Sequence, residues 1–355
     1  MKFFGKLRHL TSIILALVNV AMVLALLATG YAGVFNPARH PSTEIMVLAF
    51  PLPLVINVAF LVFWLLFNYK YAIIPLVGFL LCWGPIRNYC PVNFSSNECK
   101  DGIKVTSFNI CSLVKVKTHV AVDFFANLNS DILCLQEVPP YKEKYESFCE
   151  GMKSLYPYYE MVDRHQMERI CVYSKYPILK KELLPIESKK NNCAAFFLDV
   201  DGDTVLVLNV HFETVGLQLK ERKKIESIIK QKEIDSKERS IVRKICESAA
   251  RRAPQVDMVA DYMQKYKDMP TILCGDFNDV PNSYAYRRVE EYLDNCFKAK
   301  ATGPGFSYNQ YDMLVRIDNI FCSDDWETCS CKIDSKINIS DHYPVIATIK
   351  KRTNP

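Results

Sequence analysis

Long uncharged stretches dominate the first quarter of the chain and distinguish it from the rest. Leu10–Ala32 consists mostly of Leu, Val, Ile, Ala and Met, and Ile45–Phe67 also lacks charged residues. Both reach the length of about 20 residues that a helix needs to cross a bilayer. Tyr71–Ile86 is shorter and contains two prolines and two glycines, so it predicts either a third span or a re-entrant segment. We therefore predict a membrane region over residues 1–86 with two or three transmembrane helices.

Basic residues beside these stretches predict the orientation of the membrane region. Lys2, Lys6 and Arg8 precede the first stretch, and Lys70 lies between the second and the third. Because positive flanks stay in the cytoplasm, three spans place the rest of the chain outside the cytoplasm, whereas two spans place it inside. We predict three. The N-terminus also resembles a signal peptide, but its apolar run is long and further membrane segments follow, which favours an uncleaved anchor.

Beyond the membrane region, the pattern changes to short apolar runs and amphipathic segments. Residues 87–102 are polar and turn-rich and predict a linker. Alternating strand-like and helix-like runs then predict an α/β domain over 103–355. The predicted strands are Ile103–Asn109, Asp131–Gln136, Arg169–Ser174, Ala194–Val200, Thr204–His211, Thr271–Leu273, Ile317–Phe321 and Val345–Ile349. The predicted helices are Val116–Leu128, Lys237–Tyr266, which Pro254 interrupts, and Ser283–Leu293.

Composition excludes several classes of protein. The 355 residues are 50% hydrophobic and 23% charged, which argues against a disordered chain or a coiled coil. The long polar part after residue 86 also argues against a polytopic transporter.

The net charge of +5 is concentrated in one segment, since residues 220–252 carry twelve Lys and Arg against six Asp and Glu. Such a segment faces phosphates, a bilayer or nucleic acid, or forms the solvated face of a helix.

Fourteen cysteines are many for a chain of this length. Cys134 and Cys274 lie within apolar strand-like runs and are predicted to be small core residues. Cys171 and Cys193 lie on or beside two other predicted strands. If these strands are neighbours in a sheet, the two cysteines come within disulfide distance, and an exported domain would allow the bond.

Polar residues that can bind a metal or a phosphate lie at the ends of most predicted strands. Functional residues concentrate in the loops that follow core strands. The candidates are Asn109, Glu137, His211, Asp276, Asn278, Asp318, Asp341 and His342. Carboxylate and amide oxygens are the ligands of hard divalent cations, and a histidine or an aspartate can take a proton from water. This combination suits phosphoryl transfer, which needs positioning and charge neutralisation more than covalent attack.

The order of the motifs resembles that of the endonuclease/exonuclease/phosphatase superfamily. The motifs are FN (108–109), LQE (135–137), NVH (209–211), GDFN (275–278), RIDNI (316–320) and SDH (340–342), and the resemblance covers about residues 103–350. It implies a four-layer α/β sandwich in which two packed β-sheets are flanked by helices. Three further motifs resemble a membrane-anchored bacterial branch: YSKYP (173–177), RAPQ (252–255) and DVPNSYAY (279–286).

The resemblance implies a metal site. Asn109, Glu137 and Asp341 would hold Mg²⁺, with Mn²⁺ as an alternative. Glu137 would be the principal carboxylate ligand. No other cofactor is implied.

The resemblance also implies roles for the remaining candidates. Asp276 and Asn278 would orient or activate the attacking water and hold a phosphate oxygen. Asp318 would hydrogen-bond His342 and fix its tautomer. His211 would contact the phosphate or assist proton transfer, and water would attack phosphorus without a phosphoenzyme.

Two departures narrow the choice within the superfamily. Inositol phosphatases carry a Trp-Cys-Asp-Arg-type sequence at 316–319, where this chain has Arg-Ile-Asp-Asn. AP endonucleases usually carry Asn-Tyr-X-Pro-Asn where this chain has NVH, a form that looks more like deoxyribonucleases and sphingomyelinases. Arg169 stands where branch members often have glycine, and it either contacts phosphate or pairs at the surface.

Together these inferences predict a membrane-anchored Mg²⁺-dependent phosphoesterase that hydrolyses a phosphodiester, either as a nuclease or as a phospholipase or sphingomyelinase-type enzyme. The alternatives are a phosphomonoesterase acting on a small molecule or lipid headgroup, and a catalytically inactive membrane scaffold. The expected partners are the bilayer and a nucleic acid or phospholipid substrate, with no obligate protein partner. We expect a bacterial inner or plasma membrane, with the catalytic domain on the extracytoplasmic side.

Overall fold

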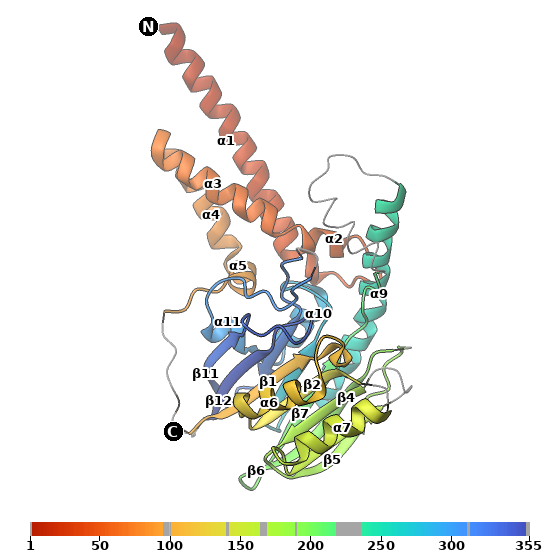
Figure 1. The fold of residues 1–355 in the computed structure, drawn as a ribbon. Helices are drawn as coiled ribbons and strands as arrows, with labels where there is room; N and C mark the ends of the chain where they lie inside the picture. Colours follow the sequence, from red (N-terminus) through yellow and green to blue (C-terminus); the bar gives the residue numbers. More distant parts are fainter. Residues whose placement is uncertain are drawn as a thin grey trace.

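The computed structural model divides the chain into an N-terminal helical region and a β-sandwich (Figure 1). It describes residues 2–94, 99, 101–139, 142–163, 169–188, 190–217, 236–310 and 313–352. The helical region contains α1 (Lys2–Tyr31), η1 (Ala32–Val34), α2 (Thr43–Leu48), α3 (Pro51–Phe67), η2 (Tyr69–Ala72), α4 (Ile73–Leu81) and α5 (Trp83–Tyr89).

Two stretches of the helical region are long and apolar enough to cross a membrane, His9–Val34 and Thr43–Phe67. A third candidate consists of Tyr69–Leu81 and Trp83–Tyr89, which meet at an angle of 70°. Pro85 explains part of this bend, because it has no N–H to donate to the carbonyl of Leu81. The hydroxyl of Tyr31 donates to that carbonyl instead, at 2.8 Å. The described residues therefore contain two candidate spans, or three if the bent pair counts as one.

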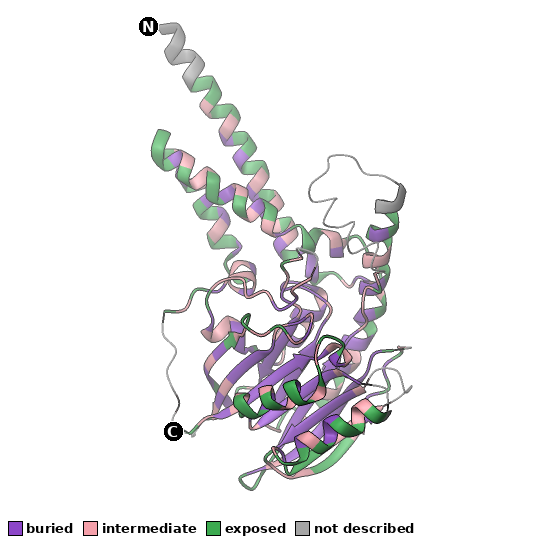
Figure 2. Ribbon diagram, viewed as in Figure 1, coloured by how far each residue is buried: buried purple, intermediate pink, exposed green. Residues whose placement is uncertain are grey.

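The helical region carries its apolar side chains outside and several polar ones inside (Figure 2). Leu24 and Leu66 are 61% and 74% exposed. Between α1 and α3, the amide of Asn19 donates to Asn57 Oδ1 at 3.0 Å, and the indole N–H of Trp64 donates to Asn19 Oδ1 at 3.0 Å. Exposed apolar surface around a polar interior is typical of helices in a membrane.

The sandwich consists of two six-stranded sheets. The first sheet has the order β11 (Trp326–Ile333), β12 (Val345–Lys351), β1 (Ile103–Asn109), β2 (Ile132–Val138), β4 (Arg169–Ser174), β3 (Tyr158–Asp163). The second has the order β5 (Ile178–Leu183), β6 (Cys193–Val200), β7 (Asp203–His211), β8 (Thr271–Asp276), β10 (Asp318–Cys322), β9 (Asp294–Asn295). Only the pairs β1/β2 and β7/β8 are parallel among the paired strands of these sheets.

Helices cover the outer face of each sheet. The first sheet carries α6 (Thr118–Leu128) and α7 (Lys142–Lys153), and the second carries α9 (Ser236–Lys265) and α10 (Tyr284–Glu290); α11 (Cys296–Lys300) lies at one edge. Strand β6 shows why its sequence is a continuous apolar run. Phe196 and Leu198 point into the core between the sheets, whereas Ala195 and Phe197 point toward α9 and its neighbours, so both faces are buried. The predicted four-layer sandwich is confirmed.

Every strand and helix predicted in the sandwich is present, but six strands and α-helices were not predicted: α7, β3, β5, β9, β11 and the short α11. Strand β5 is an edge strand whose residues 179–181 are exposed, so it has no apolar run to reveal it. The prediction that Pro254 interrupts a helix is wrong, since α9 continues through it. Ala253 and Val256 on either side of the proline are buried, and Val256 packs against the second sheet, which helps to hold the helix in place there.

The predicted bond between Cys171 and Cys193 is wrong, and both thiols are free. Strands β4 and β6, which carry them, belong to different sheets. The disulfide instead joins Cys99 to Cys329 on β11, with Cα atoms 5.8 Å apart. Cys134 and Cys274 are buried in the core between the sheets, as predicted.

The helical region is fixed to one end of the sandwich by hydrogen bonds to backbone carbonyls. The guanidinium of Arg287 donates to the carbonyl of Gly30 at 2.7 Å, and the amide of Asn282 donates to that of Pro85 at 3.0 Å. The predicted linker takes part too. Its first residues belong to α5, and Arg87 donates to the carbonyl of Lys298 at 3.0 Å.

Candidate active site

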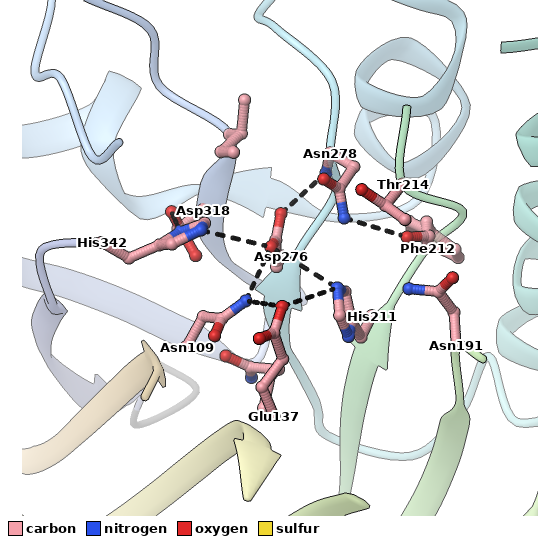
Figure 3. Close-up of polar contacts among 12 residues, drawn as sticks. Asn109, Glu137, Asn191, His211, Phe212, Thr214, Asp276, Asn278, Asp318 and His342 are labelled. Carbon is pink, nitrogen blue, oxygen red and sulfur yellow. Dashed lines mark hydrogen bonds and ion pairs between the residues drawn. The ribbon is translucent and has the colours of Figure 1, made fainter. Parts of the chain in front are cut away.

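Three candidate residues lie side by side at one edge of the second sheet. His211 ends β7 and is in register with Asp276, which ends β8, and Asp276 is in register with Asp318, which begins β10. Because β7 and β8 are parallel and β10 runs antiparallel to β8, two strand ends and one strand start meet at this edge. The side chains form a row across three strands (Figure 3).

The first sheet contributes Asn109 and Glu137 to the same place. Asn109 ends β1 and is in register with Gln136, the residue before Glu137 on β2. The Nδ2 of Asn109 donates to Glu137 Oε1 and to Asp276 Oδ2, both at 3.0 Å. Asn109 therefore joins the carboxylates of the two sheets (Figure 3). A buried hydrogen bond of 2.7 Å from Gln136 Nε2 to Asn209 Oδ1 also joins the sheets beside the site.

His342 comes from the loop between β11 and β12 and pairs with Asp318, as the motifs predict. Its Nδ1 lies 2.8 Å from Asp318 Oδ2, and its Nε2 lies 3.8 Å from Asp276 Oδ2. The ring of Tyr308 packs edge-on against it, with centroids 5.2 Å apart. The hydroxyl oxygen of Ser307 accepts the backbone N–H of Asp318 at 3.0 Å. The His342 ring is buried rather than placed on a surface loop, so its orientation is fixed from several sides.

Electrostatics within this buried group shift two pKa values. Burial alone would lower the pKa of His342, but the carboxylates of Asp318 and Asp276 outweigh it and raise the pKa to about 10. Burial and then the neighbouring Asp318 raise the pKa of Asp276, although His342 and His211 act in the opposite direction. The two carboxyl groups therefore favour the protonated form of His342.

His211 and Asn278 complete the row on the far side of Asp276. His211 Nε2 lies 3.6 Å from Asp276 Oδ2 and 3.8 Å from Glu137 Oε1. The backbone N–H of Asn278 donates to Asp276 Oδ1 at 2.8 Å, and its side chain donates to the carbonyl of Phe212 at 3.0 Å. Glu137 and Asn278 have φ values of 51° and 50°, a left-handed conformation that is uncommon for non-glycine residues, although asparagine adopts it more readily than most.

The predicted metal ligands gather around Cys111, next to this row. Burial raises the pKa of the Cys111 thiol, and the nearby carboxylates of Asp341 and Glu137 raise it further. Glu137 is the more open of the central residues, with a side chain 30% exposed. Two carboxylates and an amide form the oxygen-rich donor set that suits a hard cation such as Mg²⁺.

Two observations refine the predicted ligand set. Asn109 turns Nδ2, and not its oxygen, toward the carboxylates, while its Oδ1 accepts the N–H of Cys111 at 3.0 Å. Binding a cation through the amide oxygen requires the two amide atoms to change places. In the described part of the chain, the tightest group of possible metal ligands is instead Asp276, Asp318 and His342, whose ligand atoms lie within 4.8 Å of one another.

Several residues that support the site were not predicted from the sequence. Ser340 Oγ donates to the carbonyl of Asn109 at 2.7 Å and so holds the SDH motif to β1. Arg252, within the RAPQ motif, donates to Asp279 at 2.6 Å from a fully buried position. The RAPQ motif contributed to the family resemblance, but the role of Arg252 depends on Asp279, a partner distant in the sequence. Arg169 donates to Asp163 at 2.8 Å, which agrees with the surface-pairing alternative.

A family model matches most of the sandwich. Residues 106–342 match the endonuclease/exonuclease/phosphatase family. Residues 12–89 match a domain of unknown function, DUF8431. No curated protein matches the chain.

Solved structures share the fold of the sandwich. The truncated TDP2 of Caenorhabditis elegans is 16% identical with a TM-score of 0.50, and the match covers 70% of this chain and 97% of that one. A family protein from Bacteroides thetaiotaomicron is 17% identical with a TM-score of 0.50, covering 71% and 98%. One from Beutenbergia cavernae is 16% identical with a TM-score of 0.51, covering 70% and 72%. At these identities the likeness concerns the fold alone. The matched family model and the motif residues gathered at one edge of the sandwich lead to one conclusion: the chain belongs to the endonuclease/exonuclease/phosphatase family.

Proposed function

We propose that this protein is a membrane-anchored, Mg²⁺-dependent phosphodiesterase in which water attacks phosphorus directly. The observation that carries the proposal is the convergence of six candidate side chains from both sheets and the SDH loop. They are Asn109, Glu137, His211, Asp276, Asp318 and His342. Phosphoryl transfer requires several functional groups around one phosphate. These six side chains supply three carboxylates, two imidazoles and one amide that lie close to one another.

Glu137 and Asp341 would hold the cation, with Asn109 beside them. The cation would polarise a phosphoryl oxygen and stabilise the leaving oxygen. This assignment is supported by the oxygen-rich donor set around Cys111 and by the partial exposure of Glu137. The carboxylate of Glu137 carries the charge on which cation binding depends most.

The remaining residues would position the water and move its proton. Asp276 would hold the water and accept its proton as the new bond between oxygen and phosphorus forms and the bond to the leaving oxygen breaks. His342, charged and fixed by Asp318, would neutralise the phosphate. His211 would protonate the leaving oxygen, and Asn278 would keep Asp276 in place through its backbone N–H. The raised pKa of Asp276 favours its role as a proton acceptor.

We further propose that the sandwich lies outside the cytoplasm of a bacterial cell. Counting the bent pair Tyr69–Leu81 and Trp83–Tyr89 as a third span, together with the basic N-terminus, supports this orientation. The bond between Cys99 and Cys329 adds independent support, because disulfides persist in oxidising compartments.

Hydrolysis of bis-p-nitrophenyl phosphate and p-nitrophenyl phosphate by the full-length chain in detergent tests the reaction class. We expect Mg²⁺-dependent cleavage of the diester, with one ¹⁸O atom from labelled water in the phosphate product. A preference for the monoester would contradict the diesterase assignment. A phosphorylated enzyme trapped by rapid acid quenching would contradict direct attack by water.

A further inference from the structure

The helical region docks on the sandwich at the loop that follows β8, the strand that ends at Asp276 (Figure 1). We infer that the site acts on the phosphoester of a membrane lipid, presented by the bilayer that the N-terminal helices cross. This inference rests on the proposed function and names its class of substrate. Two separate lines of contact lead from the site to the helical region.

The first line starts from the loop that follows β8. Asp279, three residues after Asp276, accepts a hydrogen bond of 2.6 Å from Arg252. The same Arg252 nitrogen lies 3.8 Å from Glu44 Oε1. Glu44 lies in the first turn of α2, at the start of the second candidate span. All three side chains are buried, so a single ion cluster joins the loop of Asp276 to the beginning of a candidate membrane helix.

The second line starts from His342. Tyr308 packs on the His342 ring and forms β-bridges with His342 and with Val315. Val315 packs on a cluster formed by Ala32 of η1, Val47 of α2 and Val280. One loop therefore contacts the imidazole on one side and the ends of both candidate spans on the other.

The helical region and the sandwich pack closely at Gly33, so the two regions cannot move relative to each other at this point. A Cβ atom at Gly33 would lie 1.9 Å from the carbonyl oxygen of Asn282, four residues after Asn278. Glycine is therefore required for η1 to approach this loop so closely. The contact fixes the distance of the site from the helices.

This geometry sets where the bilayer surface lies relative to the site. The two candidate spans end and begin at Val34 and Thr43, on the sandwich side. Three apolar side chains stand exposed near this level: Val34 (61%), Phe35 (55%) and Leu314 (61%). Side chains of this kind are stabilised in the interfacial layer of a membrane. The scissile phosphate would then be bound close to the lipid headgroups, with a single loop of the sandwich between them.

A lipid suits this position better than a nucleic acid does. A headgroup presents its phosphate from the plane of the bilayer, whereas a polynucleotide needs open space where its chain enters and leaves the site. In the proposed reaction, water adds to phosphorus and one bond from phosphorus to an alcohol oxygen breaks. The products are an alcohol and a phosphomonoester, one of which stays in the bilayer.

The experiment uses the full-length chain reconstituted with Mg²⁺ in vesicles of phosphatidylcholine, phosphatidylethanolamine, phosphatidylglycerol and sphingomyelin. Products are followed by ³¹P NMR. We expect kcat/KM for at least one lipid to exceed that for its water-soluble, deacylated headgroup diester by about 100-fold, since the anchor raises the effective concentration of the lipid. Faster cleavage of the soluble diester, or of single- or double-stranded DNA or RNA, would overturn the inference. So would turnover of bis-p-nitrophenyl phosphate without turnover of any lipid. If bis-p-nitrophenyl phosphate is not hydrolysed either, the proposed function itself fails.

A pair of glycine variants tests whether docking matters. Gly33→Ala should lower turnover of the preferred lipid by about tenfold, because the new Cβ displaces the helices from the site, while turnover of bis-p-nitrophenyl phosphate changes by less than about twofold. Gly84→Ala is the matched control, since its Cβ would meet no atom within 4 Å. Retained turnover of the soluble ester shows that Gly33→Ala folds. Arg287→Met, which removes the hydrogen bond to Gly30, provides a second variant with the same expected result. Equal turnover of lipid in Gly33→Ala, Arg287→Met and the parent would contradict the inference.

Discussion

The helical region and the sandwich bury opposite kinds of side chain. In the sandwich, Phe196 and Ile272 fill the core between the sheets. In the helical region, Asn19 and Asn57 are fully buried while Leu66 is 74% exposed. Water drives apolar groups inward, whereas a lipid environment gives them no such drive, and helices then associate through packing and polar contacts. The difference agrees with the proposal that the helical region lies in a bilayer and the sandwich in water.

Some exceptions to this contrast lie at the candidate active site. The sandwich buries few charged groups, yet Asp276 and Asp318 are both 1% exposed. Burying charge is costly unless partners compensate, and here His342 and Asn109 do so. These buried charged residues lie at one end of an otherwise apolar core, which indicates that they serve catalysis rather than the stability of the sandwich.

Removing the imidazole of His342 should have the largest effect on turnover and should leave the structure of the helical region unchanged. His342→Gln keeps much of the volume of the buried ring but removes its charge, so kcat for bis-p-nitrophenyl phosphate should fall about 10³-fold. His119→Gln, on the exposed face of α6, is the control and should keep the parental rate. Parental kcat in His342→Gln would remove His342 from the catalytic group.

The disulfide should contribute to the stability of the sandwich and not to its chemistry. Cys329→Ser should lower the free energy of unfolding by about 3 kcal/mol, because Cys99 and Cys329 close a loop of 230 residues. Urea unfolding followed by tryptophan fluorescence measures the change, and Cys331→Ser, a buried free cysteine on the same strand, is the control. An unchanged midpoint, with both thiols reactive in the unfolded parent, would show that the bond does not form.

The charge of Glu137 should determine cation affinity. Glu137→Gln preserves the shape of the side chain, so the Kd for Mg²⁺ measured by titration calorimetry should rise about tenfold. Glu143→Gln, at the exposed start of α7, is the matched control. If Glu137→Gln binds Mg²⁺ as tightly as the parent does, Glu137 is not a ligand.

The smallest effect should come from the polar pair inside the helical region. Asn57→Leu should cost about 1 kcal/mol of helix association in detergent, as interhelical hydrogen bonds in membranes typically contribute. Asn209→Leu should cost more, because Asn209 donates to the carbonyls of Leu135 and Cys171 and accepts from Gln136 in the centre of the sandwich. Equal costs for the two variants would break the comparison between the two regions.

Sequence patterns predicted the site residues because each lies in a short motif at a strand end. They could not predict which strands become neighbours, since register and sheet order depend on contacts distant in the sequence. The Cys171–Cys193 bond failed for this reason, as the two residues lie in different sheets. The cluster of Glu44, Arg252 and Asp279 was missed for the same reason, because its members come from α2, α9 and the loop after β8.

The Mg²⁺ dependence of turnover tests the central claim most directly. The full-length chain is assayed with bis-p-nitrophenyl phosphate before and after EDTA, and then with Mg²⁺ added back. We predict that EDTA abolishes hydrolysis and that Mg²⁺ restores it in the parent but not in His342→Gln. The same rate with and without EDTA, or no hydrolysis at any Mg²⁺ concentration, would contradict the account.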